Sequence, residues 1–250
     1  MKRFEGKRVL VTGAASGIGQ ASAQRMASEG ATVACVDLKA DGCEETVKQI
    51  EHDGGLAFAL ACDVSDEARV NATVEEAVGR LGGLDSLCNI AGILHFTHTH
   101  ELELAKWNQI LAVNLTGTFL MSKAALPALL ADDGGNVVNM ASTAGLAGHP
   151  WTAAYSASKG GVLAFTWTLA VEYGKQGLRA NAVCPGAVAT PMHEVFELPE
   201  GGDVKLIDRI SPLDKFRGPD KAASVVAFLA SEDAEHINGE SVRVDGGTLA

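Results

Sequence analysis

The chain has 250 residues, of which 47% are hydrophobic and 20% are charged, so its composition is that of a folded globular protein and not of a disordered one. Its length suits one large α/β domain that needs no disulfide or metal to hold it together. With 20 Lys and Arg against 31 Asp and Glu, the net charge of −11 argues against nucleic acid or an anionic membrane as a partner, because both are bound through basic residues.

Short runs of β-type residues alternate with helical stretches along the whole chain. Strands are predicted at residues 8–12, 32–37, 56–61, 84–89, 136–140, 179–184 and 241–244. Helices are predicted at about 17–29, 42–52, 103–130, 152–173 and 219–230, with a further helix capped by Ser65. Apolar strands that each lead into a helix indicate a parallel sheet covered on both faces. We therefore predict a doubly wound α/β fold of about seven strands, in a single domain over residues 1–250.

The region from Pro185 to Pro219 is the least regular part of the chain, since it holds five prolines and a Gly201-Gly202 pair. Long irregular segments in compact domains are often functional lids. We expect a mobile substrate lid at about residues 187–215.

The N-terminal segment is rich in charge and leads directly into Val9-Leu10-Val11, without the apolar core of a secretory signal. None of the cysteines forms a Cys-x-x-Cys pair; they are Cys35, Cys43, Cys62, Cys88 and Cys184. Free thiols that act as small buried hydrophobes are typical of a reducing compartment. We expect a cytoplasmic protein with no disulfide, membrane attachment or metal site.

A glycine-rich turn follows the first predicted strand, with the sequence Thr12-Gly13-Ala14-Ala15-Ser16-Gly17-Ile18-Gly19. Glycines at a strand-to-helix turn let a pyrophosphate approach the main chain, and the helix N-terminus offers it free N–H groups. The same pattern occurs in ordinary turns, but its place between the first strand and the first helix favours a dinucleotide cofactor.

Asp37 ends the second predicted strand, eighteen residues after Gly19. An acid there can accept hydrogen bonds from both hydroxyls of the adenosine ribose, although an Asp at a strand end can also simply cap a turn. A 2′-phosphate about 4 Å away would meet a repulsion of roughly 4 kcal/mol per unit charge, so the sequence predicts NAD over NADP. Ser16 is neutral and does not offset this repulsion of a 2′-phosphate, whereas Lys39 is near enough to weaken the preference for NAD.

Tyr155 and Lys159 stand at i and i+4 in a predicted helix and therefore share a face. A cation close to a phenol lowers its pKa, and bringing the pKa from about 10 to near 7 needs roughly 4 kcal/mol. Lys159, helped by an oxidised nicotinamide, would make Tyr155 a general acid/base at neutral pH. Taken alone, the two residues could equally form an ordinary surface pair.

Together, these motifs resemble the short-chain dehydrogenase/reductase family of the ~250-residue type. Motifs along nearly the whole chain carry the resemblance, namely Thr12–Gly19, Asp63-Val64, Asn89-Ile90-Ala91-Gly92, Asn114, Ser142, Tyr155-x-x-x-Lys159, Arg179-Ala180-Asn181 through Pro185-Gly186, and Val244-Asp245-Gly246-Gly247. One departure is Ile90, where the family often has a second Asn. The resemblance implies a Rossmann-type fold and a homotetramer with a nicotinamide cofactor.

The resemblance also implies a role for each matched residue. Tyr155 would transfer the proton, Ser142 would bind the substrate oxygen, and Lys159 would bind the nicotinamide ribose and tune Tyr155. Asn114 would hold a water that links Lys159 to solvent, unless it is simply a satisfied polar residue of the core. Cofactor contacts are implied for Gly13, Ser16, Gly17, Ile18, Gly19, Asp37, Asp63, Val64, Asn89, Ala91, Gly92, Tyr155, Lys159, Pro185, Gly186, Val188 and Thr190.

The substrate pocket is expected next to Ser142 and Tyr155, in segments 93–96, 143–151 and the lid. Mostly apolar side chains are expected to line it, with three histidines among them: Ile93, Leu94, Phe96, Leu146, Trp151, Met192, Val195, Phe196, His95, His149 and His193. Segments 93–96 and 143–151 contain no Lys or Arg, so a neutral and partly apolar small molecule is favoured over a multiply anionic one.

The sequence therefore predicts an NAD-dependent oxidoreductase that moves a hydride between nicotinamide and a secondary alcohol or ketone. An NADPH-dependent 3-oxoacyl-carrier-protein reductase is the near alternative, against which Asp37 and the acidic balance speak. A non-catalytic NAD-binding sensor or scaffold is the alternative from another class, and the intact set of Asn114, Ser142, Tyr155 and Lys159 speaks against it.

Overall fold

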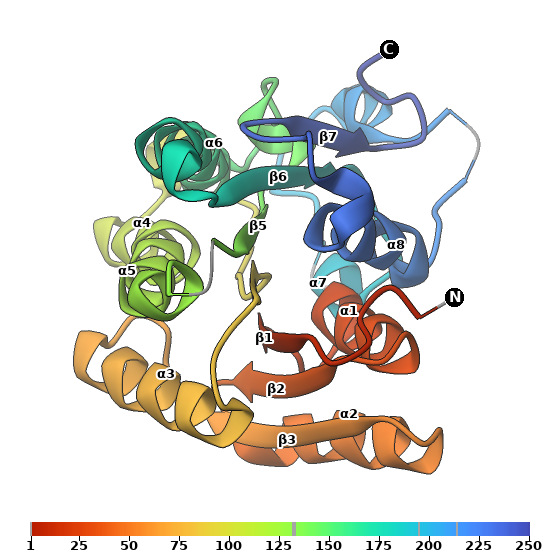
Figure 1. Ribbon diagram of the computed structural model, residues 1–250. Coiled ribbons are helices and arrows are strands. Elements are labelled where there is room, and N and C mark those ends of the chain that lie inside the picture. Colours follow the sequence, from red (N-terminus) through yellow and green to blue (C-terminus); the bar gives the residue numbers. More distant parts are fainter. Residues whose placement is uncertain (1, 132–133, 195, 214) are drawn as a thin grey trace.

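A seven-stranded parallel sheet forms the centre of the part of the chain that the computed structural model describes, residues 2–131, 134–194, 196–213 and 215–250 (Figure 1). The strands lie side by side in the order β3-β2-β1-β4-β5-β6-β7. Their bounds are β1 (Arg8–Thr12), β2 (Thr32–Asp37), β3 (Leu56–Ala61), β4 (Ser86–Asn89), β5 (Asn136–Met140), β6 (Arg179–Pro185) and β7 (Ser241–Val244). Each neighbouring pair is parallel, which confirms the predicted doubly wound α/β fold.

Helices cover both faces of the sheet. Helices α1 and α8 lie on one face, and α3, α5 and α6 lie on the other (Figure 1). The helices are α1 (Gly17–Ser28), α2 (Ala40–His52), α3 (Glu67–Leu81), α4 (Leu104–Leu111), α5 (Gly117–Leu129), α6 (Ala153–Tyr173), α7 (Pro191–Glu194) and α8 (Pro219–Ala230). Short 3₁₀ turns cover Thr99–Glu101, Thr143–Gly145, Gly174–Gln176, Val204–Ile210 and Glu232–Ala234.

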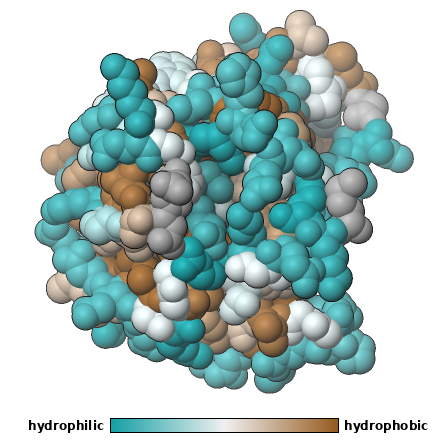
Figure 2. All heavy atoms as spheres, in the orientation of Figure 1, coloured by the Kyte–Doolittle hydropathy of each residue, from teal (hydrophilic) through white to brown (hydrophobic). Residues whose placement is uncertain are grey.

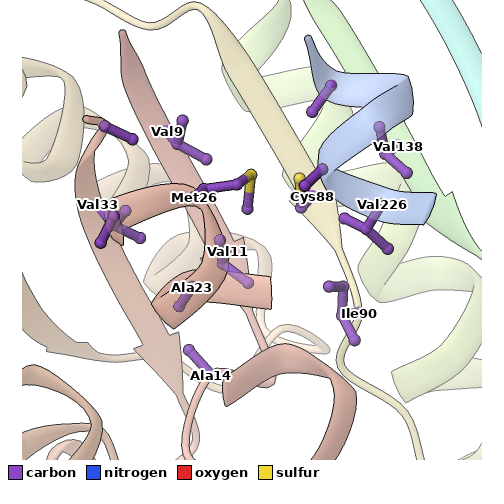
Figure 3. Packing of buried hydrophobic residues seen from close by; sticks show 14 of the residues in the cluster. Val9, Val11, Ala14, Ala23, Met26, Val33, Cys88, Ile90, Val138 and Val226 are labelled. Carbon is purple, nitrogen blue, oxygen red and sulfur yellow. The ribbon is translucent and has the colours of Figure 1, made fainter. Parts of the chain in front are cut away.

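Alternate residues of the central strands feed two separate cores, because successive side chains of a strand point to opposite faces. Val9 and Val11 of β1 pack with Met26 of α1 and Val226 of α8 (Figure 3). Leu10, between them, packs into the core under α3, α5 and α6. This two-sided burial explains why the strands read as continuous apolar runs.

The strand order places the functional site. The chain goes outward from β1 to β2 and β3, then crosses back to β4 on the other side of β1. In open α/β sheets, ligands bind at such a reversal, outside the carboxyl ends of the strands. The residues that follow β1 and β4 are the glycine-rich turn and Ile90-Ala91-Gly92, so both predicted motifs meet at this point.

The predicted cap of one helix was wrong, and a second predicted helix holds a turn that the sequence did not indicate. Asp66, and not Ser65, caps α3, since its carboxylate accepts hydrogen bonds from the N–H groups of Ala68 and Arg69. The helix predicted over 103–130 runs from Leu104 to Leu129, but Ala112–Thr116 forms a π-helical turn within it. Such turns frequently occur at functional sites.

This Leu104–Leu129 helix is also long and apolar enough to cross a membrane by length and composition. In the structure, 44% of its most apolar stretch is buried, and α4 and α5 pack against α6 and α3. The helix therefore serves as a core helix of the fold.

Candidate active site

A cleft of about 630 Å³ opens at the carboxyl ends of the strands. It collects the glycine turn after β1, the ends of β2 and β4, the loop after β5, the start of α6 and the segment after β6. The predicted site residues that line it are Gly13, Ser16, Gly17, Ile18, Gly19, Asp37, Asp63, Val64, Ala91, Gly92, Ser142, Tyr155, Lys159, Pro185, Gly186, Val188 and Thr190. Asn89 and Asn114 do not line it.

The glycine turn is too tight for side chains. A Cβ on Gly13 would lie 2.9 Å from the main chain of Ala91, and one on Gly19 would lie 2.0 Å from the carbonyl oxygen of Gly13. Gly13 and Gly17 have φ angles of 70° and 54°, which favour glycine. Ser16 caps α1 with its backbone alone and makes no side-chain cap hydrogen bond. The helix N-terminus can therefore offer its N–H groups to a phosphate, so the cradle fits a dinucleotide.

Thr12 joins the glycine turn to the end of β4. Its hydroxyl accepts hydrogen bonds from the N–H groups of Ile90 at 3.0 Å and Ala91 at 3.1 Å. Ile90, which replaces the family's second Asn, turns its side chain into the core beside α1 and α8 (Figure 3). Ile90 also lines the cleft, so the departure places an apolar residue where the core meets the cleft wall.

Asp37 is held in one orientation by two backbone groups. One carboxylate oxygen accepts from the N–H of Ala15 at 3.1 Å, and the other accepts from the N–H of Leu38 at 2.8 Å. A carboxylate oxygen has capacity for more than one hydrogen bond, so both can still accept from a ribose. The charge of Asp37 is thus fixed beside the glycine turn.

Asp63 and Val64 form the wall after β3. The carboxylate of Asp63 accepts hydrogen bonds from the N–H and hydroxyl of Ser65, and these hydrogen bonds hold its pKa below the usual value. Val64 is buried against Gly117 of α5. Asp63 also orders the loop before α3 through these two hydrogen bonds.

Asn89 lies beneath the cleft and does not line it, although a cofactor contact was predicted for it. It is the last residue of β4 and is 3% exposed. Its amide nitrogen donates to Ser122 of α5 and to Asn139 of β5, so the side chain points into the protein. Asn89 can act on the cleft only through these neighbours.

Asn114 sits inside the π-helical turn and is fully buried. Its side-chain oxygen accepts from the N–H of Ile93, while its nitrogen donates to the carbonyl of Ile93 and to Ser158. A Cβ on Gly92 would lie 3.3 Å from the Asn114 oxygen and 3.5 Å from Nζ of Lys159. Asn114 therefore lies directly behind the residues that line the cleft. Its hydrogen bonds hold the main chain of Ile93, which is one of them.

Ser142 and Tyr155 meet across the cleft. Ser142 follows β5, is 7% exposed, and accepts a hydrogen bond from the N–H of Ala144. Burial raises the pKa of the Tyr155 phenol, and a hydrogen bond with Ser142 offsets part of the rise. The two hydroxyls can thus converge on one oxygen atom of a bound substrate.

Lys159 lies one helical turn after Tyr155, with its Nζ 5.6 Å from the centre of the Tyr155 ring. The ammonium donates a hydrogen bond to the carbonyl of Met140. Burial keeps the pKa of the Tyr155 phenol above its usual value. The lowering predicted from the sequence also depends on an oxidised nicotinamide, so it stays a prediction.

The segment after β6 closes the cleft from the far side. The N–H of Gly186 donates to the carbonyl of Val244, which ties this segment to β7. A Cβ on Gly17 would lie 3.3 Å from the methyl group of Thr190, so Thr190 packs against the glycine turn. A cofactor in the cleft would be enclosed between these two segments.

Comparisons with known proteins agree with this geometry. A family model described as Enoyl-(Acyl carrier protein) reductase matches residues 13–248. The D-threitol dehydrogenase of Mycolicibacterium smegmatis is 42% identical over 98% of this chain and 94% of its own length. A crystal structure of a short-chain type dehydrogenase/reductase from Mycobacterium marinum superposes with a TM-score of 0.91, at 30% identity, covering 99% of this chain and 97% of that one.

The chain is a short-chain dehydrogenase/reductase. This membership makes it an oxidoreductase that works with a nicotinamide cofactor on a small molecule. Two further relatives in the family are similar to it over nearly their whole length. The meso-2,3-butanediol dehydrogenase of Serratia marcescens is 38% identical over 99% of this chain and 96% of its own. The 3-oxoacyl-(acyl-carrier-protein) reductase of Thermotoga maritima is 37% identical over 99% of both.

The substrate end of this dehydrogenase/reductase's cleft agrees only in part with the sequence prediction. Six of the predicted residues line it: Ile93, Leu94, Phe96, His149, Met192 and Phe196. Leu146, Trp151 and His95 do not. Leu146 is 40% exposed, and Trp151 packs against Gly202. Val195 lies outside the described residues, and the side chain of His193 is not described.

Several lining residues were not named by the sequence analysis. Among them are Gln109, Ile207, Ile210 and Phe216. Gln109 comes from α4, and the two isoleucines come from the 3₁₀ helix Val204–Ile210 within the predicted lid. The apolar spacing of that helix was the available signal, but nothing in the sequence indicates that it reaches the cleft.

Proposed function

We propose that this protein is an NAD-dependent dehydrogenase/reductase of secondary alcohols and ketones. The observation that carries the proposal is the hydrogen bond between Ser142 and Tyr155 in the cleft that also contains the uncapped N-terminus of α1. One end of the cleft suits a pyrophosphate, and the other holds two hydroxyls facing a mostly apolar wall. The names of the threitol and butanediol dehydrogenases support an alcohol substrate.

In the mechanism that we propose, Tyr155 gives or takes the proton at the reacting oxygen, and Ser142 holds the same oxygen by a hydrogen bond. When bound, the nicotinamide accepts or supplies the hydride. Lys159 binds its ribose and, once turned from Met140 toward Tyr155, favours the phenolate. Asn114 holds the main chain at Ile93, and it also holds a water that links Lys159 to solvent. The segment 187–215 closes over the substrate and excludes water.

NAD is proposed over NADP on the strength of Asp37. Its carboxylate is fixed by Ala15 and Leu38, so it cannot swing away from a 2′-phosphate without losing two hydrogen bonds. Lys39, two residues on, belongs to the exposed start of α2 and does not line the cleft.

The second candidate is an NADPH-dependent 3-oxoacyl-carrier-protein reductase. The family description and the Thermotoga maritima relative favour it. Asp37 and the net charge of −11 oppose it, because an acidic carrier protein needs a basic docking surface.

A homotetramer in the cytoplasm is the proposed working form. Large apolar side chains are exposed on α5 and α6, namely Phe119, Trp167 and Val171, at 44%, 47% and 85% exposure. Figure 2 shows hydrophobic residues gathered on the side of the molecule where α4, α5 and α6 lie. Clustered apolar surface of this kind favours association with another copy. All five thiols are buried and free, which supports a reducing compartment.

A turnover panel tests the proposed function. Secondary alcohols and ketones are offered with NAD(H) and NADP(H), and nicotinamide fluorescence reports both binding and turnover. We expect turnover of small neutral alcohols with NAD. A preference for 3-oxoacyl thioesters with NADPH would support the second candidate, and cofactor binding with no turnover at all would indicate a sensor or scaffold.

A further inference from the structure

The imidazole of His149 carries a buried nitrogen with nothing to bond to. Three buried side-chain polar atoms lack a hydrogen-bond partner within the described residues, namely Asn89 Oδ1, Asn136 Oδ1 and His149 Nε2. Of these three residues, only His149 lines the cleft that contains Ser142 and Tyr155. Buried polar groups are nearly always paired, so an exception in a cleft points to a ligand atom.

Hydrogen bonds tie the loop that carries His149 to the start of α6, beside Tyr155. The hydroxyl of Thr152 donates to the carbonyl of His149 at 3.1 Å and lies 2.9 Å from the hydroxyl of Ser156, the residue after Tyr155. Trp151 has a φ of 61°, a strained value for a bulky side chain, and its carbonyl accepts the N–H of Thr97. Such strain persists only where the surroundings dictate the backbone, and it is found most often at functional sites.

The other polar side chains that the structure describes around the substrate space are already engaged or lie in solvent. The hydroxyls of Thr143, Thr152 and Ser211 each donate to a main-chain carbonyl. Gln109 is exposed, and its oxygen accepts from Lys106. The remaining neighbours, such as Ile93 and Phe96, are apolar. Among the side chains that the structure describes, His149 is therefore the buried polar group at this end of the cleft that is left for a substrate.

The charge state of His149 fits recognition of a neutral group. Burial lowers the pKa of this imidazole below 6.5, so it is neutral at pH 7. A neutral imidazole has one donor and one acceptor nitrogen, and it can therefore pair with a hydroxyl or with a carbonyl oxygen. Both groups occur in the proposed reaction, because it converts an alcohol into a ketone or the reverse.

We propose that Nε2 of His149 hydrogen-bonds to a second oxygen of the substrate, on the carbon next to the reacting one. The residue would select vicinal diols and α-hydroxyketones over simple secondary alcohols. A site with a buried polar group discriminates strongly against an analogue that leaves the group unpaired. The inference rests on the proposed function, because Tyr155 and Ser142 must hold the reacting oxygen for His149 to reach its neighbour.

The test compares meso-2,3-butanediol with 2-butanol, which differ by the hydroxyl in question. For the wild type, kcat/KM with NAD should be at least about tenfold higher for the diol. In the His149→Leu variant, the ratio of the two kcat/KM values should fall by about 10- to 100-fold. His149→Gln, which returns a hydrogen-bonding amide of similar reach, should recover part of the ratio.

Each outcome decides something different. A wild-type ratio near one, or a ratio that neither variant changes, overturns the role of His149 while leaving the proposed function intact. Failure of the wild type to oxidise either alcohol, or to reduce the matching ketones, contradicts the proposed function itself. Thermal unfolding controls for folding, since replacing an unpaired nitrogen by Leu should not lower the midpoint. If the Leu variant does not fold, the wild-type ratio and the Gln variant still decide.

Discussion

The ammonium of Lys159 donates a hydrogen bond of 2.6 Å to the main-chain carbonyl of Met140, the last residue of β5. Lys159 is only 3% exposed, and burial lowers its pKa from 10.5 to about 8. At neutral pH the protein therefore keeps a cation in a desolvated place next to Tyr155. Keeping this buried charge lowers the free energy of unfolding.

Lys159→Met should make the protein more stable at pH 7, by about 1–2 kcal/mol, because it removes a buried charge at the loss of one hydrogen bond to Met140. The pKa of Lys159 is lower in the folded chain, so between pH 8 and about 10.5 the unfolded chain binds more protons. Wild-type stability relative to the variant should therefore rise over this range. Urea unfolding at pH 7, 8.5 and 10 measures the difference. A variant less stable than wild type at pH 7 would contradict the prediction.

Tyr155→Phe should still bind NADH and lose turnover by about 10²- to 10⁴-fold, the usual contribution of a positioned proton donor. The ring remains to pack in the cleft, while the hydroxyl that pairs with Ser142 is gone. Fluorescence titration with NADH and steady-state kinetics separate the two effects. Retained turnover would remove Tyr155 from the proposed mechanism.

Asp37→Ser should reduce the preference for NAD over NADP by about 10²- to 10³-fold, since it removes the charge that repels a 2′-phosphate. The smaller side chain also gives up the hydrogen bonds from Ala15 and Leu38, so affinity for NAD should fall. The ratio of kcat/KM with NADH and NADPH is the measurement. Lys39→Ser, on the exposed residue nearby, is the matched control and should change the ratio little. Equal use of both cofactors by the wild type would refute the role of Asp37.

Gly19→Ala should destabilise the fold by about 3 kcal/mol or more and abolish cofactor binding, because its Cβ would lie 2.0 Å from the carbonyl oxygen of Gly13. Gly79→Ala, on the exposed face of α3 with no atom within 4 Å of the new Cβ, is the control. It should stabilise the protein by about 0.5–1 kcal/mol through helix propensity. Thermal unfolding with and without NADH compares the two. Similar effects of both substitutions would mean that the turn tolerates a side chain.

The strands and most helices were predictable because apolar runs and glycines determine them locally. The cap of α3 was not, since Ser65 and Asp66 are both good capping residues and only the backbone geometry selects Asp66. The residues around the proposed cofactor site follow from motifs at strand ends, and strand ends meet at one edge of a parallel sheet. Asn89 is the exception, because the pleat turns its side chain toward Ser122.

The substrate side was harder to predict for a physical reason. Ile207, Ile210 and Phe216 reach the cleft only through the path of a long irregular segment, and no local pattern encodes that path. Trp151 was misplaced because its left-handed backbone turns the ring toward Gly202. His149 was predicted to line the pocket and does line the cleft, but its lack of a partner is visible only in three dimensions.

The π-helical turn Ala112–Thr116 changes the phase of the helix that contains it. One extra residue per turn rotates the following side chains by about 100° relative to an uninterrupted α-helix. The apolar stripe of α4 packs on α6, and after the offset the stripe of α5 packs on α3. The continuous helix Leu104–Leu129 thus connects α6, which carries Tyr155 and Lys159, with α3 in the same layer of helices. Deleting one residue from this turn would re-register every side chain downstream and carry Asn114 away from Ile93.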